Sequence, residues 1–234
     1  RNAREAARST RETISSEMWE HVNSFYFMVM DAALNQEILM SPQDFFHSVK
    51  MASHQFQGVT DATMSHGEGW HFSNMGRMLE RADKTSRILD VKYYLLLPDI
   101  HDVGTPIDDL QWSSVLRSVS GFEMFRKRHH GITPDRVAGY LILDRSFPRA
   151  IMYCVNAADE SLHAISGSPL GTFWNMAEKR MGQLRSELAY TNVTDIIGQG
   201  LHEFLDSFQT RLNNVGEAVY ETFIAMRPAE EASI

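Results

Sequence analysis

Charged residues whose types and spacing could carry out chemistry are concentrated in the stretch GRMLERADKTSRILDVKY, residues 76–93. If the stretch is helical, each residue advances about 100° around the axis, and one side carries Arg77, Glu80, Lys84 and Arg87. Neighbouring cations favour the charged form of a carboxylate, which makes Glu80 a candidate general base. The same residues are three and four positions apart, so they could equally form surface ion pairs. The stretch therefore predicts either a charged helix face or a polar site around Glu80.

Apolar residues beside these charges favour an inward orientation. The side that carries Glu80 continues as Ile88, Val91 and Leu95, while the other side is an apolar seam over residues 72–96. A helix that is apolar on both sides is normally buried on both sides. We therefore expect the charged stripe to face other parts of the protein or a cavity. A buried charge must be paired or held for a ligand, so a structural ion-pair network and a polar pocket are the two alternatives.

A second set of cations lies at the start of the sequence, at Arg1, Arg4, Arg8 and Arg11. Their spacing of three and four aligns them on one side of a helix. Guanidinium groups suit carboxylates and phosphates, so this side is a candidate anion-binding face. Surface pairing with the neighbouring glutamates is the alternative reading.

Two Glu-x-x-His sequences raise the possibility of a metal site, namely Glu68 with His71 and Glu160 with His163. Di-iron helical bundles present two ligands from one helix face at this spacing. Two further carboxylates would be needed, and the intervening helices offer Glu17 and Glu123. One or two such matches are expected by chance in a chain with this many Glu and His residues. We therefore expect ordinary polar residues at helix ends and predict no metal and no cofactor.

The elements that must position these residues are all expected to be helices, because apolar residues recur at three and four positions and not at two. Helix starts are indicated where a Ser or Thr precedes a proline, as at residues 41–42, 105–106 and 133–134. The expected helices span about 1–34, 70–97, 106–130, 148–166, 169–190 and 194–226, with a further helix from residue 42 to the interruption at 66–69 and a short one that begins at residue 134. We predict an all-α protein, a single compact bundle of about seven to eight helices over residues 1–227, with a flexible tail over 228–234.

Composition excludes several classes of protein. The chain has 234 residues and a net charge of −8, which disfavours a broad nucleic-acid-binding surface. The single cysteine, Cys154, rules out an internal disulfide and suits the cytoplasm. No run approaches the ~18 apolar residues that a membrane span needs. The sequence opens within a helical pattern and without an initiating Met, so we expect that its natural N-terminal segment is missing.

Four separated blocks of the sequence, in order, resemble the bacterial alpha-E domain family, which is named for its helical character and its Glu-Arg motif. The blocks are ISSEMWE (14–20), GRMLERADKTSRILDVKYYLLLP (76–98), HGITPDRVAGYLILDRSFPRA (130–150) and ADESLHAISG (158–167). Members usually begin with a further segment that carries an earlier Glu-Arg copy, in a pattern like YWxGRYLERAE. This chain lacks that copy.

The resemblance implies a cytoplasmic helical protein whose gene lies beside, or is fused to, that of a circularly permuted ATP-grasp enzyme, often with a transglutaminase-like protein. Such ligases join carboxylates to amines, so the implied setting is the synthesis or modification of a peptide-like amide. The residues carried over by position are Gly76, Arg77, Glu80, Arg81, Arg87 and Asp90, then Arg8, Arg11, Glu17 and Trp19, and finally Asp144, Arg145, Pro148 and Arg149.

Three functional hypotheses follow from the sequence. The first is an accessory or binding protein for an ATP-grasp amide ligase or a transglutaminase-like protein, with charged helix faces that bind the partner or an anionic, peptide-like ligand. The chain has no P-loop of its own. The second is an enzyme that uses the Glu80–Arg81 motif in acid–base chemistry on a peptide-like substrate. The third is a helical bundle with a carboxylate–histidine metal site.

Overall fold

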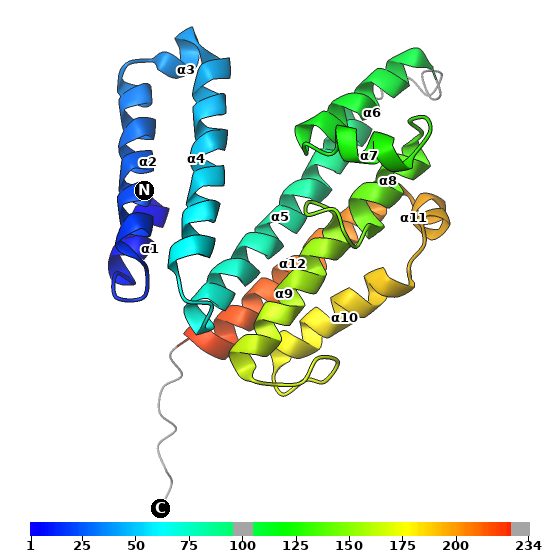
Figure 1. Ribbon diagram of the computed structural model, residues 1–234. Coiled ribbons are helices and arrows are strands. Elements are labelled where there is room, and N and C mark those ends of the chain that lie inside the picture. The colour runs from blue at the N-terminus through cyan, green and yellow to red at the C-terminus, as the bar shows by residue number, and fades with distance from the viewer. Residues whose placement is uncertain (96–104, 226–234) are drawn as a thin grey trace, which may run out of the picture. The chain divides into compact units, whose positions relative to one another are not determined.

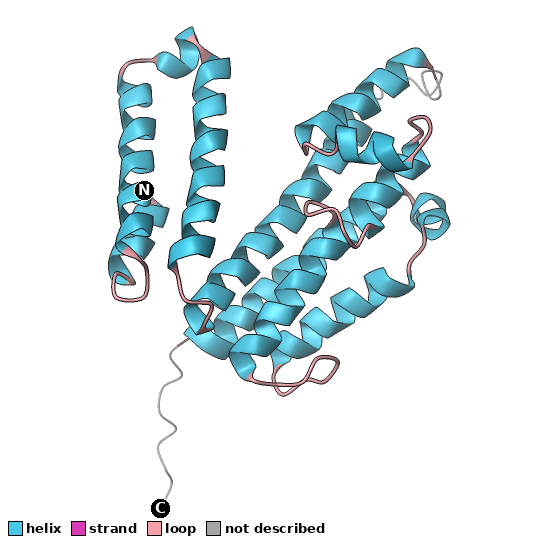
Figure 2. Cartoon of the chain, in the orientation of Figure 1, coloured by secondary structure: helices cyan, strands magenta, loops and turns pink. Residues whose placement is uncertain are grey.

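The computed structural model describes residues 1–95 and 105–225, and every regular element within them is helical (Figure 2). The α-helices are α1 (Asn2–Ser9), α2 (Ser16–Leu34), α3 (Glu37–Met40), α4 (Pro42–Thr63), α5 (Glu68–Leu95), α6 (Pro106–Ser118), α7 (Phe122–Arg128), α8 (Pro134–Leu143), α9 (Ile151–Ser166), α10 (Met176–Tyr190), α11 (Val193–Gln199) and α12 (Leu201–Val219). A π-helical turn, Tyr220–Ile224, follows α12. The all-α prediction is confirmed, and the predicted tail over 228–234 lies outside the described residues.

The predicted number of seven to eight helices is wrong, because twelve α-helices occur in the described residues. Several expected helices are divided by local breaks. Gly200 (φ 103°) lies between α11 and α12, and Ser120 (φ 53°) lies between α6 and α7. A positive φ interrupts helical geometry and is reached most easily by glycine. A side chain at position 200 would therefore strain the turn that separates α11 from α12.

The predicted helix starts are confirmed at all three Ser-Pro or Thr-Pro sequences. Pro42, Pro106 and Pro134 each occupy the first turn of a helix. The Thr105 hydroxyl also accepts a hydrogen bond from the backbone N–H of Asp108, which satisfies one of the donors left free at a helix start. These starts are encoded locally, since proline has no N–H to lose and its φ already suits a helix.

The chain divides into two compact units, Arg1–His71 and Phe72–Ile234. In the first unit, α2 and α4 lie side by side (Figure 1). A hydrogen bond of 2.8 Å joins Nε2 of His21 on α2 to the Ala52 carbonyl on α4. Among the described side chains of this unit, Met18, Ala32 and Thr60 are the buried ones. The predicted extent of one domain over 1–227 stays a prediction.

The second unit holds a continuous apolar core. Helix α10 packs against both α9 and α12 (Figure 1). Leu162 on α9, Met181 on α10 and Leu205 on α12 are completely buried. None of the described helices combines the length and the apolar character that crossing a membrane requires. The second unit thus supplies a rigid frame for polar groups on α5, α9 and α10.

Candidate functional site

The two residues of the Glu-Arg motif have different environments. Arg81 is half-buried, and its Nη1 donates a 3.1 Å hydrogen bond to the Pro148 carbonyl. One turn later, the Thr85 hydroxyl donates to the Arg149 carbonyl at 2.8 Å. Glu80, by contrast, is exposed. Helix α5 therefore holds the segment that leads into α9 through Arg81 and presents Glu80 on its surface.

The prediction that the charged stripe faces inward is wrong for Glu80, Lys84 and Arg87, whereas Arg77 is half-buried. Glu80, Lys84 and Arg87 are all exposed, and 47% of Val91 is exposed. The side chain of Leu95 is not among those described. Ile88 packs only partly against the core. The apolar residues were a poor guide because the buried side of α5 also carries the polar residues Asn74, Thr85, Ser86 and Lys92.

On that exposed face, Asp83 pairs with Arg87 at 2.8 Å and with Lys84 at 3.5 Å. The hydrogen bond from Arg87 is the main cause of a lowered pKa of Asp83, and the charges of both cations add to it while partial burial opposes it. The ion pairs expected on a charged helix face are therefore present, with Asp83 as the shared carboxylate.

Other residues predicted to bind a ligand link helices to one another. Arg77 donates from Nη2 to Oδ1 of Asn74 at 2.6 Å, and Nδ2 of Asn74 donates to the Ser161 hydroxyl on α9 at 2.9 Å. Asp90 lies 2.7 Å from Nδ1 of His202 on α12. The hydrogen bond from His202 to Asp90, assisted by the charge of the carboxylate, raises the pKa of His202. These contacts support the structural alternative at Arg77 and Asp90, and ligand binding there stays a prediction.

Asp144 shapes the turn between α8 and α9. Its Oδ1 accepts hydrogen bonds from the backbone N–H groups of Ser146 and Phe147, and its Oδ2 lies 2.6 Å from Nη1 of Arg128. Burial alone would raise the pKa of Asp144, but these donors together lower it. The neighbouring candidate, Arg145, is exposed. The Asp144 carboxylate therefore has a structural role that its sequence position did not reveal.

The predicted arginine stripe in the first unit is not continuous, because α1 ends at Ser9. Arg8 pairs with Glu5 at 3.1 Å, whereas Arg11 lies beyond the helix and donates to the Ser16 hydroxyl at 3.3 Å. The third candidate of this block, Glu17, is exposed in the first turn of α2. These residues lie close together in sequence without forming one anion-binding face.

A hollow of about 830 Å³ lies in the first unit between α1, α2 and α4. Its walls are mainly apolar, with Phe25 and Phe56 among them. Two of the polar groups at its edge already have partners, because His21 is bonded to the Ala52 carbonyl and Arg4 donates to Asn23 at 2.6 Å. It therefore lacks the converging polar groups that mark a specific site.

The proposed metal ligands do not come together. Within the residues that the structure describes, no group of three or more His, Cys, Asp or Glu side chains could hold a metal ion. Glu68 and Glu160 are both exposed, whereas His163 is buried. The Glu-x-x-His spacing failed as a guide because the buried neighbour of His163 one turn earlier is Asp159 and not Glu160.

Cys154 is a core residue with no exposed surface. Its Sγ lies 3.5 Å from the Pro148 carbonyl, to which it donates. Burial raises the pKa of Cys154 to about 11, despite the opposing charges of Arg81 and Arg149. The thiolate that a nucleophile requires is therefore disfavoured at neutral pH.

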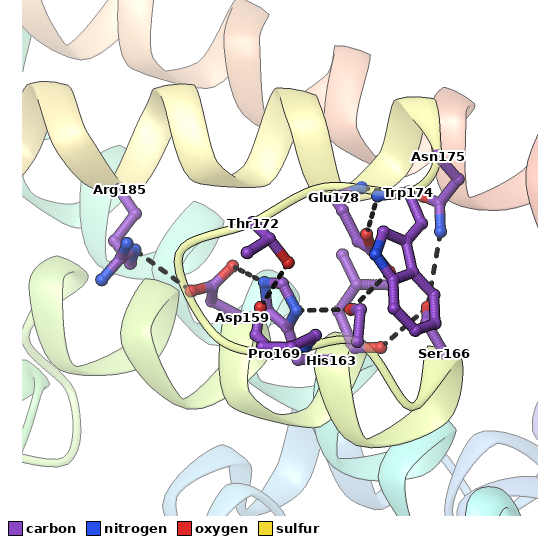
Figure 3. Close-up of polar contacts among 11 residues, drawn as sticks. Asp159, His163, Ser166, Pro169, Thr172, Trp174, Asn175, Glu178 and Arg185 are labelled. Carbon is purple, nitrogen blue, oxygen red and sulfur yellow. Dashed lines mark hydrogen bonds and ion pairs between the residues drawn. The ribbon is translucent and has the colours of Figure 1, made fainter.

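A group of buried polar side chains lies between α9 and α10 (Figure 3). Nε2 of His163 is 3.6 Å from Oδ1 of Asp159, and Nδ1 of His163 is 2.6 Å from the Ser168 hydroxyl. Ser168 in turn donates to Oε1 of Glu178 at 2.9 Å. Arg185 approaches the other Asp159 oxygen, with its Nε 3.1 Å from Oδ2. A chain of polar contacts thus runs from α9 through the loop to α10.

Local sequence explains how this group is assembled. Asp159 and His163 are one turn apart on α9, so both face α10. Gly167 ends α9 in the left-handed conformation (φ 70°), which turns the chain so that Ser168 comes beneath His163. Asn175 caps α10 by accepting from the backbone N–H of Glu178, which fixes Glu178 in the first turn.

The hydrogen bonds determine where the protons lie. Burial would raise the pKa of Glu178, but hydrogen bonds from the backbone N–H of Trp174 and from serine hydroxyls lower it, so Glu178 is an acceptor. Ser168 gives its proton to Glu178 and must then accept one from Nδ1 of His163. The remaining nitrogen, Nε2, faces Asp159. Desolvation raises the pKa of Asp159, opposed mainly by Arg185 and then by His163. Asp159 therefore keeps a proton more readily than an exposed aspartate does.

A cavity of about 270 Å³ adjoins this group. Asp159, His163 and Glu178 form part of its wall, and Lys179 and Arg185 also line it. The sequence predictions included His163, but paired it with Glu160 and not with Asp159. They missed the other four residues. The four-residue spacing of Asp159 and His163 within ADESLHAISG was the signal that could have located the site.

Comparison with known proteins places the chain in a family. Searches of curated proteins and of solved structures found no significant match. The Alpha-E family, described as "a predicted alpha-helical domain with a conserved ER motif", matches residues 1–224. The only Glu-Arg dipeptide of the sequence is Glu80–Arg81, whose two side chains respectively face solvent and hold the start of α9. With nearly its whole length matched and an all-helical fold, the chain belongs to the Alpha-E family.

Proposed function

We propose that this protein is an accessory binding protein that acts with a circularly permuted ATP-grasp amide ligase, or with a transglutaminase-like protein, in the synthesis or modification of a peptide-like product. A cytoplasmic location is part of this proposal. The proposal rests on the different environments of the two residues in the Glu-Arg motif. Arg81 holds the protein's own backbone, while Glu80 is exposed.

The surface around Glu80 suits a protein partner. Glu80, Lys84 and Arg87 place both signs of charge along one face of α5, and the half-exposed Val91 adds an apolar contact. Mixed charges around apolar groups favour specific pairing with a complementary protein surface. A net charge of −8 disfavours nucleic acid as the occupant.

Acid–base catalysis by Glu80 is less well supported. A general base works best in an enclosed site that shifts its pKa and excludes water. Glu80 is exposed and lines neither of the two cavities described above. The geometry therefore favours recognition by this residue over catalysis.

Copurification with the ATP-grasp ligase encoded beside its gene tests the proposal. Glu80→Arg reverses the charge at the centre of the exposed face, and we expect the dissociation constant of the complex to rise about tenfold or more, equal to ~1.4 kcal/mol. Glu217→Arg is the matched control, because Glu217 is an exposed glutamate on α12. Failure to form any complex, or equal binding by both variants, would contradict the proposal.

A further inference from the structure

The cavity between α9 and α10 has the features of a built site. Three ionisable side chains in its wall, Asp159, His163 and Glu178, are each at least 96% buried. Two of them have their orientation fixed by hydrogen bonds, since Ser168 bonds both His163 and Glu178. Such groups are costly to bury, and their convergence on one cavity is characteristic of ligand sites.

The carboxylate of Asp159 lacks a hydrogen-bond donor at Oδ1. This oxygen is buried, and among the described residues it accepts no hydrogen bond, since Nε2 of His163 is 3.6 Å away. A buried acceptor without a donor is destabilising, and such groups are rare in folded proteins. A ligand that carries an ammonium or amide N–H could supply the donor from within the cavity.

Cations that line the same cavity favour a ligand that also carries a negative group. Lys179 is exposed, and its ammonium lies 5.8 Å from the centre of the Phe173 ring. The charge on Arg185 is only partly balanced by Asp159, because this guanidinium approaches Asp159 through Nε, and the side chain remains 36% exposed. Guanidinium and ammonium groups are suited to binding carboxylates.

We propose that this cavity binds a small molecule that carries both a carboxylate and an N–H donor, namely a free amino acid or the carboxyl-terminal end of a short peptide. The ligand carboxylate contacts Lys179 and Arg185, and its nitrogen donates to Asp159. A volume of about 270 Å³ is close to the lower limit of ligand pockets, ~300 Å³, which fits a ligand of this size. The site lies apart from Glu80, and the inference does not depend on the proposed partner.

His163 is a positioning residue in this scheme. When a ligand ammonium approaches Asp159, it favours the ionised carboxylate. Ser168 and Glu178 fix the orientation of the His163 ring from the other side, through the hydroxyl that joins them.

Calorimetric titration of the whole protein with the twenty L-amino acids and L-alanyl-L-alanine tests the proposal. We expect at least one of these probes to bind. Replacing the carboxylate of the best probe by a carboxamide should weaken binding about tenfold or more. A further arm, the N-acetylated form of that probe, separates the two sources of ligand. Equal binding indicates a peptide end, and loss of binding indicates a free amino acid.

Two variants identify the groups responsible. Lys179→Gln should weaken binding by about fivefold to tenfold, and Asp159→Asn should reduce the preference for the free amine over its acetylated form. Lys127→Gln is the matched control, because Lys127 is an exposed lysine on α7. Circular dichroism and thermal unfolding check that each variant folds. Absence of binding by every probe, or equal binding by the wild type and both site variants, would overturn the inference.

Discussion

The hydrogen bond between Asp90 and His202 joins α5 to α12 and involves a group that titrates near neutral pH. The raised pKa of His202 means that folding favours the protonated imidazole, chiefly through its hydrogen bond to Asp90. Glu203 and Asp206 contribute in the same direction. A link of this kind makes the stability of the protein depend on pH.

The stabilisation that His202 contributes decreases as pH rises. A group whose pKa is raised by folding contributes its full stabilisation below its unfolded value, ~6.5 for histidine, and loses it as pH rises through the folded value. We therefore expect the free energy of unfolding to fall between about pH 6 and pH 8 more steeply in the wild type than in Asp90→Asn. Urea titrations across this range measure the difference.

His130→Gln serves as the control for that experiment, because His130 is exposed. Its pH profile should run parallel to that of the wild type. A profile of Asp90→Asn that also runs parallel to the wild type would show that Asp90 and His202 are not coupled.

At the scale of the helices, a buried ion pair connects α5 with α6. Nζ of Lys92 lies 2.8 Å from Oδ1 of Asp108 and 2.6 Å from Oε1 of Gln111. Lys92 is 1% exposed and Asp108 is 3% exposed. Trp112 borders the same ammonium, with its ring centre 5.3 Å away. A buried charge of this kind is tolerated only with its partners in place.

Removing one member of this ion pair should therefore lower the free energy of unfolding strongly. Lys92→Met leaves the Asp108 carboxylate buried without its cation, and we expect a loss of about 3–5 kcal/mol in the free energy of unfolding. Lys84→Met, on the exposed face of the same helix, should change it by no more than about 0.5 kcal/mol. Chemical denaturation measures both values. Similar small losses in the two variants would show that the buried pair contributes little.

Helix starts could be predicted from the sequence, and some helix breaks could not. Pro42, Pro106 and Pro134 act locally, so the sequence alone is sufficient. The break before α2 depends on a distant contact, since Ser15 both caps α2 and lies 2.6 Å from Thr63 of α4 through their hydroxyls. A pattern within one helix contains no information about such a partner.

The orientation of α5 and the site between α9 and α10 could not be predicted from the sequence for the same reason. Asn74 and Lys92 are buried because Ser161 and Asp108 receive their hydrogen bonds, and both partners lie far along the chain. From the sequence alone, a polar residue is expected to be exposed, because the partner that would allow its burial is not known. Asp159 likewise becomes significant only when the loop after Gly167 and the start of α10 are folded against it.

At the scale of the whole molecule, the two units differ in how much they bury. The first unit buries only Met18, Ala32 and Thr60 among its described side chains, whereas the main apolar cluster belongs to the second unit. Large apolar side chains such as Phe27 and Phe46 are at least 50% exposed in the first unit. Burial of apolar surface is the main source of stability, so the two units should differ in local stability.

Amide hydrogen exchange should reveal that difference. We expect the amides of α2 and α4 to exchange about tenfold or more faster than those of α9, α10 and α12, equal to ~1.4 kcal/mol less local stability. Mass spectrometry of peptides from each helix measures the rates. Uniform protection across both units would contradict this expectation.

The burial of the single thiol has a practical consequence. Cys154 has no exposed surface, and its pKa is raised to about 11. Thiol reagents require an accessible thiolate, so the native chain behaves toward them as though it had no cysteine. A substitution such as Lys84→Cys on the exposed face of α5 can therefore carry a fluorophore or a spin label at one defined position without removal of the natural cysteine.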